Sequence, residues 1–390
     1  MNKIIIVILS VFNILNVFAQ LKPINDVSPD PSGIKAISGD WFINGKKNFS
    51  TSIKNQDQTN TCWSFSTTSL VESEAYKNKL GVLDLSEMYV VRKMYLEKAS
   101  NYLLRQGKAQ FSEGGLGHDV IHAISTYGAI TQSAYNGLTN GSKNYSHTQM
   151  FLDLKRYVDS TLKSRKPSTV QDWKPGFERI LDKYIGVLPN QFSYNNVKYT
   201  PIEFASKLLK FNESDYVNLT SFQHHPYYKP FIIEVPDNFS NGAYYNLPLE
   251  EMIRVTETAL QNGHTVLWDA DVSNNGFDGK NGMAMHLAPS DELVKQMNPD
   301  FKEATWNADI RQQLFENFTT QDDHLMHIVG IEKTKQGKTF FIVKNSWGTD
   351  GEYNGYVHVS EAYFAINTIS LVVPKAAINL PLLQKLKLEK

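Results

Sequence analysis

The pattern of apolar and polar positions along the chain predicts helices in its first part and strands in its last third. Residues 62–78, 86–104 and 119–127 suit helices, with Ser86 as an N-cap and Gly81 and Gly128 as stops. Apolar or alternating runs at 265–268, 339–343, 355–359 and 369–373 favour strands. Helices followed by strands indicate an α+β fold with segregated halves, and a cleft between such halves is a natural active site.

The middle of the chain, residues 137–260, gives weaker signals. Apolar residues recur at helical spacing over 150–162, and 201–209 suits another short helix. The segment 217–235 is mixed and compatible with short strands. We find no internal repeat.

The N-terminus has the pattern of a secretory signal peptide. A short positive region, Met1-Asn2-Lys3, precedes an apolar run over 4–18 and the sequence Val17-Phe18-Ala19. Asn13 and Asn16 interrupt the run, which is shorter than the apolar stretch that a transmembrane helix usually needs. The weaker alternative is an uncleaved anchor. We therefore expect residues 1–19 to be removed and the mature protein to be exported, periplasmic or secreted, without a membrane attachment.

Composition narrows the function classes. Apolar residues make up 41% and charged residues 20% of the chain, with a formal net charge of -1. This balance argues against a general nucleic-acid or anionic-membrane binder, which would usually carry a basic excess. Cys62 is the one cysteine, so no intramolecular disulfide can form, and in an exported protein such a thiol is either buried and inert or kept for its chemistry.

The surroundings of Cys62 favour chemistry. A polar, turn-prone run over 55–61 leads into it and a helix follows, and a helix N-terminus lowers the pKa of a thiol. A nucleophilic thiol also needs a histidine base, a residue that orients the imidazole, and oxyanion donors. Among ten histidines we select His327, because a hairpin following it could bring it beside Asn345, with Trp347 shielding their hydrogen bond.

An ordered set of short motifs resembles the papain-like cysteine peptidases. The motifs are Asn55-Gln56, Cys62-Trp63-Ser64-Phe65-Ser66, Leu85-Ser86-Glu87, Gly114-Gly115, His327 and Asn345-Ser346-Trp347-Gly348. The resemblance implies a two-lobed fold with a helical lobe and a β-rich lobe. It also implies roles for single residues: Cys62 as nucleophile, His327 as acid and base, Asn345 as orienter, the Gln56 side chain with the Cys62 N–H as oxyanion hole, Gly114 and Gly115 as backbone contacts for substrate, and Trp63 and Trp347 as supports.

Departures from papain narrow the resemblance to the bleomycin hydrolase and aminopeptidase C branch. The separation of Cys62 and His327 is far above the ~130–150 residues of papain, which implies a large, mainly helical insertion. Thr59 stands where secreted papains usually have a disulfide cysteine. Residues 262–272 are similar to the strand that borders the branch's cleft. Trp268, Ala270 and Asp271 are therefore candidate substrate-binding residues, with plain strand packing as an equal alternative.

This resemblance gives an expected domain organisation and function. We expect a peptidase domain over 20–390, made of a helical lobe (about 50–136), an inserted region (about 137–260), a β-rich lobe (about 261–373) and a C-terminal tail (374–390). The branch implies an aminopeptidase that assembles as a hexameric barrel, with the chain's own C-terminal carboxylate holding the peptide's free amino group. The tail here does not clearly match.

Two alternatives stay open. A tail packed elsewhere would leave an open cleft and give an endopeptidase. A non-catalytic relative that binds peptide or nucleic acid is the other possibility, although the charge balance counts against nucleic acid. Thiolate, imidazole and amide suffice for the chemistry, so we expect no cofactor and no metal.

Overall fold

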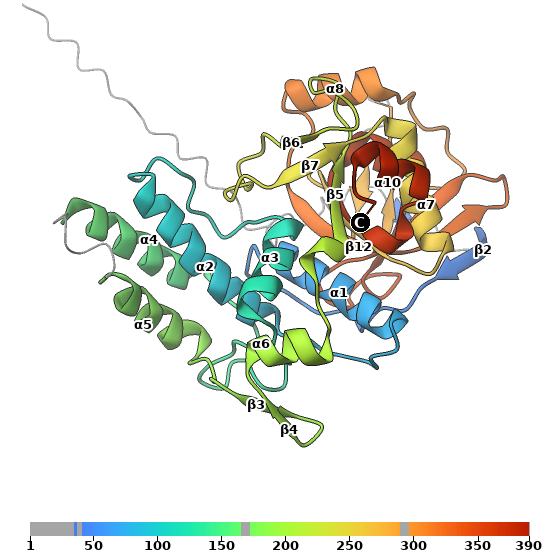
Figure 1. The fold of residues 1–390 in the computed structure, drawn as a ribbon. Coiled ribbons are helices and arrows are strands. Elements are labelled where there is room, and N and C mark those ends of the chain that lie inside the picture. Colours follow the sequence, from blue (N-terminus) through green and yellow to red (C-terminus); the bar gives the residue numbers. More distant parts are fainter. Residues whose placement is uncertain (1–34, 37–40, 165–171, 289–295, 390) are drawn as a thin grey trace, which may run out of the picture.

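The computed structural model describes residues 35–36, 41–164, 172–288 and 296–389, and Figure 1 shows a helical part beside a part built around a large mixed sheet. The predicted signal peptide, residues 1–19, lies outside the described residues. The α+β class is confirmed. None of the helices among the described residues is long and apolar enough to cross a membrane.

The helical lobe begins with three helices at the predicted places. They are α1 (Cys62–Lys77), α2 (Glu87–Leu104) and α3 (Gly117–Tyr127). The Ser86 hydroxyl accepts from the Tyr89 N–H and caps α2, while Gly128 ends α3 at a φ of 84°, which a glycine adopts without strain. Helix α1 packs against strand β12 (His324–Thr334), so its N-terminus faces the sheet.

The inserted region contains helices along its whole length, with short strands between them. Its first helices are α4 (Thr148–Lys163) and α5 (Lys174–Ile185). A small hairpin of β3 (Phe192–Tyr194) and β4 (Val197–Tyr199) follows α5. The short α6 (Pro201–Glu203) comes next and continues as a π-helix over Phe204–Leu208. A 3₁₀ turn (Glu213–Asp215) leads into β5 (Tyr216–Thr220), followed by β6 (Pro230–Ile232), β7 (Ala243–Asn246) and α7 (Leu249–Gln261). Strands β5 to β7 join the main sheet, so the mainly helical insertion also contributes strands to the β-rich part.

The main sheet runs in the order β6-β7-β5-β15-β8-β12-β13-β14-β10-β9, and β2 also pairs with β12. Its further strands are β2 (Phe42–Lys47), β8 (Val266–Ala270), β9 (Phe277–Asp278), β10 (Met283–Ala284), β13 (Thr339–Lys344), β14 (Tyr356–Ser360) and β15 (Thr368–Pro374). Outside it lie β1 (Lys35–Ala36) paired with β11 (Gln296–Met297), and the helices α8 (Ala308–Glu316) and α9 (Glu361–Asn367).

The two faces of the sheet bury different cores. On β8 and β12, Leu267 and Leu325 join the core of the helical lobe, which also contains Cys62. Their neighbours Trp268 and Met326 point the other way, into the core of the β lobe. Because side chains alternate along a strand, this register decides which residues of β8 and β12 reach the boundary between the lobes.

The C-terminal tail packs on the β lobe. After a 3₁₀ turn (Lys375–Ala377), helix α10 (Leu380–Leu386) buries Leu382 and Leu386 in the β-lobe core, and Leu388 packs against the same core. The ammonium of Lys385 lies 3.9 Å from the Glu251 carboxylate on α7 and over the ring of Tyr228. The described part of the tail is therefore held on the β lobe by apolar and ionic contacts.

Candidate active site

Cys62 is the first residue of α1 and is buried. Burial raises the pKa of its thiol, and the backbone N–H of Leu325 opposes this by donating to the sulfur. The carboxyl groups of Asp322, Asp237 and Asp269 raise the thiol pKa further. The resting thiol is therefore protonated and needs a nearby base to become a nucleophile.

The histidine at this site is His324, and the prediction that His327 pairs with Asn345 is wrong. The Nε2 of His324 lies 2.8 Å from Oδ1 of Asn345, and its ring stacks on Trp347 with ring centres 4.6 Å apart. Since Leu325 donates to the Cys62 sulfur, the residue that precedes it on β12 lies beside the thiol.

His327 occupies a different environment. Its Nδ1 lies 2.9 Å from the hydroxyl of Ser69, which also accepts from the Lys344 ammonium. Ser69 is seven residues after Cys62 on α1, about 10 Å along the helix axis. Burial, with the charge of Lys344 added, lowers the pKa of His327 well below its ordinary value. His327 is thus a neutral interior residue between the lobes.

Strand geometry explains this correction. In the hairpin, His327 lies opposite Lys344, and not Asn345. His324 and His327 are separated by three positions, an odd number, which places their side chains on opposite faces of a regular strand. His324 follows two aspartates at the polar start of β12, whereas His327 is followed directly by Ile328 and Val329. The polar neighbours of His324 and the apolar neighbours of His327 could have indicated, from the sequence, which histidine lies at the site.

Asn345 fixes the tautomer of His324. Its Oδ1 also accepts from the Ser346 N–H at 2.7 Å, so this oxygen is an acceptor and the His324 Nε2 carries the proton. The other ring nitrogen, Nδ1, is buried without a hydrogen-bond partner among the described residues. Burial lowers the pKa of His324, while the Asn345 bond raises it. The resulting neutral imidazole has a free lone pair for the proton of Cys62.

Gln56 lies in the loop before α1 with its amide held in one orientation. Its Oε1 accepts from the Ser346 hydroxyl at 2.6 Å, and its Nε2 donates to the Thr59 carbonyl at 2.6 Å. An amide nitrogen has two hydrogens, so one N–H of Gln56 is left for a further acceptor. The backbone N–H of Cys62, the first residue of α1, likewise has no helical acceptor.

Trp63 supports the double glycine. Its indole N–H lies 3.1 Å from the Asn60 carbonyl and 3.0 Å from the Glu113 carbonyl, and its ring lies against Gly115. The carbonyl of Gly114 accepts from the buried Lys98 ammonium. The structure therefore holds Gly115 against Trp63, the residue after Cys62, and holds Gly114 on the Lys98 ammonium.

A loop of the inserted region lies on Gly114. A Cβ atom built at Gly114 would be 1.8 Å from Oδ2 of Asp237, so only glycine allows this approach. Asn238 braces the loop, since its amide bonds the Ile233 carbonyl and both backbone groups of Gly242. This contact between distant parts of the chain was not visible in the sequence.

The predicted substrate-binding residues of β8 do not line the cleft. Trp268 and Ala270 are buried in the β-lobe core, and the Trp268 indole donates to the Thr368 hydroxyl at 2.8 Å. The Asp271 carboxylate is used within a turn, where it accepts from the backbone N–H groups of Gln321 and Ser273. The alternation along β8 instead directs Asp269, which we did not select, toward the helical lobe.

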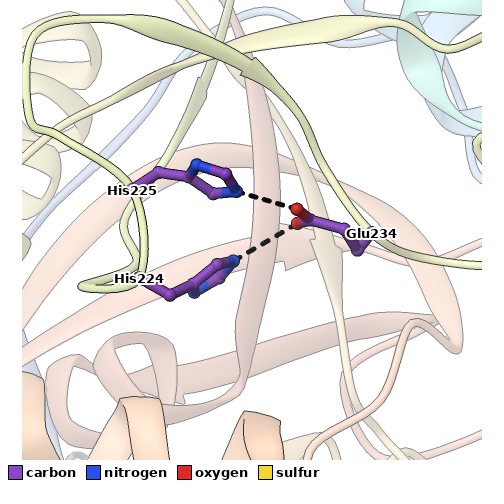
Figure 2. Close-up of side chains that lie close together, drawn as sticks. All are labelled: His224, His225 and Glu234. Atoms are coloured by element: carbon purple, nitrogen blue, oxygen red, sulfur yellow. Dashed lines mark hydrogen bonds and ion pairs between the residues drawn. The ribbon is translucent and has the colours of Figure 1, made fainter.

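One other cluster has a composition that suits a metal. The side chains of His224 and His225 both direct Nε2 at the carboxylate of Glu234, at 3.2 and 2.8 Å (Figure 2). However, the Gln312 amide nitrogen lies 2.8 Å from Nδ1 of His224. Nδ1 is therefore an acceptor, and the Nε2 that a metal would need carries a proton donated to Glu234. This arrangement is built as a hydrogen-bonded cluster.

Comparisons with known proteins agree with this geometry. Residues 189–389 match the model of the Peptidase C1-like family, and residues 37–176 match that of the Papain family cysteine protease. Cysteine proteinase 1, mitochondrial, from Saccharomyces cerevisiae (strain ATCC 204508 / S288c) is 23% identical over 372 residues, which covers 83% of this chain and 74% of the yeast protein.

Bacterial peptidases give similar matches. Aminopeptidase W of Lactobacillus delbrueckii subsp. lactis is 24% identical over 378 residues, covering 86% of this chain and 83% of that protein. Aminopeptidase C of Listeria innocua is 23% identical over 379 residues, covering 85% and 82%. The crystal structure of PepW from Lactobacillus rhamnosis superposes with a TM-score of 0.68 at 20% identity, over 88% of this chain and 84% of PepW, which establishes a shared fold. The resemblance to the aminopeptidase C branch is confirmed.

Proposed function

Since the chain belongs to the Peptidase C1-like family and is a papain-like cysteine peptidase, we propose that it removes single residues from the N-termini of peptides through Cys62, His324 and Asn345. The family assignment gives the class of reaction. The residues and the choice of aminopeptidase action are our proposal, supported by the geometry of the site and by the aminopeptidases among the relatives.

The first half of the reaction forms an acyl-enzyme. The Cys62 thiol passes its proton to Nδ1 of His324, and the sulfur attacks the scissile carbonyl carbon. The carbonyl oxygen becomes an oxyanion, which the Cys62 backbone N–H and the free N–H of Gln56 stabilise. His324 then returns the proton to the leaving amine as the peptide bond breaks, and Asn345 keeps the ring oriented throughout.

The second half regenerates the enzyme. A water molecule takes the place of the departed amine, and His324 accepts one of its protons as the oxygen attacks the thioester. Collapse of the tetrahedral intermediate releases the carboxylic acid and gives the proton back to Cys62. The neutral thiol and imidazole inferred for the resting site carry the one proton that both halves require.

The approach of Asp237 to Gly114 is the observation that carries aminopeptidase action. The braced loop 233–242 occupies the edge of the cleft at the double glycine, where an extended chain running past Cys62 would need room. A peptide that ends near Cys62 avoids this obstruction, and placing a free N-terminus there limits productive binding to exopeptidase geometry.

An endopeptidase is the alternative, favoured by the tail. Helix α10 packs on the β lobe, so the described part of the tail is committed to contacts outside the double-glycine edge. The test compares a dye-linked amino acid that has a free amine with its N-acetylated form. A preference of at least a hundredfold for the free amine supports the aminopeptidase, whereas equal or faster cleavage of blocked peptides would establish the endopeptidase.

We also propose that the protein is exported and that it forms a homo-hexamer. The signal-peptide pattern of residues 1–19 supports export, and N-terminal sequencing of the protein recovered outside the cytoplasm should begin near Gln20. The family resemblance supports the hexamer, which light scattering would detect as six times the mass of the mature chain. We propose peptides as its partners and not nucleic acid, in line with a formal net charge of -1.

A further inference from the structure

The cleft face of the sheet carries an unusual row of residues. Asp269 of β8 lies directly opposite Leu325 of β12 on one side and Ser370 of β15 on the other. Directly opposed residues point to the same face of a sheet, and Leu325 is the residue whose N–H reaches the Cys62 sulfur. The Asp269 carboxyl therefore lies on the cleft face, one strand away from the backbone that contacts the nucleophile.

Only one of the two carboxylate oxygens of Asp269 has a recorded donor among the described residues. The side chain is buried, with 1% of the surface of Asp269 exposed. Its Oδ2 accepts from the Ser370 hydroxyl at 2.9 Å, whereas Oδ1 is buried and receives no donor from the residues that the structure describes. A buried carboxylate oxygen without a donor is costly, so its retention beside a nucleophile points to a group that arrives from outside.

Two further carboxyl groups lie close enough to Asp269 to act on it. Asp322, two residues before His324, places its carboxyl against that of Asp269. Asp237 approaches from the inserted loop across Gly114, and its charge acts on both of the other acids. The three acids come from three separate segments of the chain and surround one end of the cleft.

These acids have no cationic partner in the part of the chain that the structure describes. None of the three forms an ion pair there. Lys98, the buried lysine whose charge acts on Asp237 and Asp322, is bonded to the carbonyls of Ser112 and Gly114. The half-buried Asp237 accepts from the Gln110 amide and the Ser112 hydroxyl. The adjacent carboxyls of Asp269 and Asp322 cannot both ionise unless a cation joins them.

We propose that Asp269, Asp322 and Asp237 form the subsite that binds an ammonium group of the substrate. The inference rests on the proposed peptidase function and names what the cleft selects. A primary ammonium has three donors, which suits Oδ1 of Asp269 and the neighbouring oxygens of Asp322 and Asp237. The ammonium is supplied either by the free N-terminus of the peptide or by a lysine-like side chain. In the second case the lysine-like residue directly precedes the residue whose carbonyl is cleaved.

This subsite makes a terminal carboxylate unnecessary for amine recognition. Residues up to Leu388 pack on the β lobe, and the tail carries the cations Lys385 and Lys387, which suit an amine-binding site poorly. The carboxylates that recognise the amine are instead internal to the sheet and the inserted loop.

The test measures Asp269→Asn and Asp322→Asn separately, with Asp309→Asn on the exposed start of α8 as the matched control. Four substrates share one dye: Leu-dye, acetyl-Leu-dye, acetyl-Lys-Leu-dye and acetyl-norleucyl-Leu-dye. Alkylation of Cys62 by iodoacetamide, which is uncharged, reports on the thiol and imidazole independently. Circular dichroism checks that each variant is folded.

We expect each cleft variant to lose about tenfold to hundredfold in kcat/KM on the ammonium-bearing substrate, in line with the loss of a charged hydrogen bond. The iodoacetamide rate should not fall, because each variant removes a carboxyl that raises the pKa of the Cys62 thiol. Selective loss on Leu-dye identifies the N-terminus as the source of the ammonium, and selective loss on acetyl-Lys-Leu-dye identifies the side chain. Unchanged kcat/KM, or equal losses on all four substrates, would overturn the subsite.

A failure of the proposed peptidase function would give different experimental results from a failure of the subsite. If the wild-type protein is alkylated at Cys62 but hydrolyses none of the four substrates, the peptidase proposal fails before the subsite is tested. If the Asp269→Asn and Asp322→Asn proteins cleave every substrate that the wild-type protein cleaves, and cleave each equally well, the peptidase proposal stands and the subsite alone is rejected.

Discussion

The imidazole of His324 and the side-chain amide of Asn345 are joined by a 2.8 Å hydrogen bond between Nε2 and Oδ1, and the ring of Trp347 lies against the imidazole. This bond leaves Nδ1 as the free nitrogen beside Cys62. It also places the proton-accepting atom on a residue whose backbone neighbour, Leu325, already contacts the sulfur. The residues that we propose as nucleophile, base and orienting amide are thus connected by contacts from α1, β12 and the residue after β13.

Gln56→Ala should lower kcat by about 10²–10³, the usual loss for one oxyanion donor, and leave the iodoacetamide rate nearly unchanged. The physical reason is that Gln56 stabilises charge that develops only on the substrate. Single-turnover kinetics with Leu-dye would measure the loss. Gln56→Glu keeps the side-chain shape and provides the control, because it removes the donor while an acceptor for Ser346 remains. A variant with full activity would remove Gln56 from the oxyanion hole.

The pH dependence should differ between hydrolysis and alkylation. Burial, with the charges of Asp237 and Asp323 added, raises the pKa of Asp269 to about 7, and the hydrogen bonds of Ser370 and Asp322 oppose this rise. Below pH 7 the carboxyl is therefore protonated and loses its attraction for an ammonium. Burial lowers the pKa of His324 from its ordinary value, so the imidazole remains a base at that pH. We expect kcat/KM for a free-amine substrate to fall as pH drops through about 7, while alkylation of Cys62 persists to lower pH.

The Asp269→Asn protein supplies the control for this pH profile. The kcat/KM of its residual hydrolysis should no longer fall near pH 7. It should fall at the same lower pH as the alkylation rate, since protonation of His324 then limits both reactions. If hydrolysis and alkylation by the wild-type protein share one acid limb, ionisation of Asp269 does not govern binding.

Asp269→Asn should also make the protein more stable above pH 7. A carboxyl whose pKa is raised in the folded state binds more protons there than in the unfolded chain between about pH 4 and pH 7, so the wild-type protein loses stability as pH rises through that window. The amide cannot ionise and avoids this loss. Thermal unfolding should give a higher Tm for the variant at pH 8 and little difference at pH 4. A lower Tm at pH 8 would mean that the ionised carboxylate has a stabilising partner.

Extending the C-terminus should leave substrate selection unchanged. Adding Gly-Ser-Gly after Lys390 moves the terminal carboxylate but keeps the contacts of Leu382 and Leu386 with the β lobe. We expect the ratio of kcat/KM for Leu-dye and acetyl-Leu-dye to stay within twofold of the wild-type value. A collapse of that ratio would assign amine recognition to the terminal carboxylate and not to the internal acids.

Local sequence patterns were sufficient for much of the helical lobe. The N-cap at Ser86, the stop at Gly128 and the start of α1 at Cys62 each depend on residues close together in the chain, and the structure has all three where expected. The nucleophile and Asn345 could likewise be selected from their immediate motifs. Such features depend on local hydrogen bonding and backbone preference, which a sequence displays directly.

Features that depend on strand register were not predictable in the same way. Selecting His327 was an error of pairing, because the hairpin sets His327 opposite Lys344 and it is His324 that reaches Asn345. Selecting Trp268 and Ala270 as cleft residues was an error of strand face, because both side chains join the β-lobe core. The contact of Asp237 with Gly114 joins segments more than a hundred residues apart and has no local signal at all.

The central claim is that His324, and not His327, is the base for Cys62. The most direct measurement compares kcat/KM for Leu-dye in His324→Ala and His327→Gln. General acid–base catalysis accounts for about 10²–10⁴ in rate, so His324→Ala should lose roughly a thousandfold in kcat/KM. His327→Gln should stay within about threefold in kcat/KM and instead lower Tm, because it alters a buried hydrogen bond to Ser69. A thousandfold loss in His327→Gln, with His324→Ala active, would contradict the account.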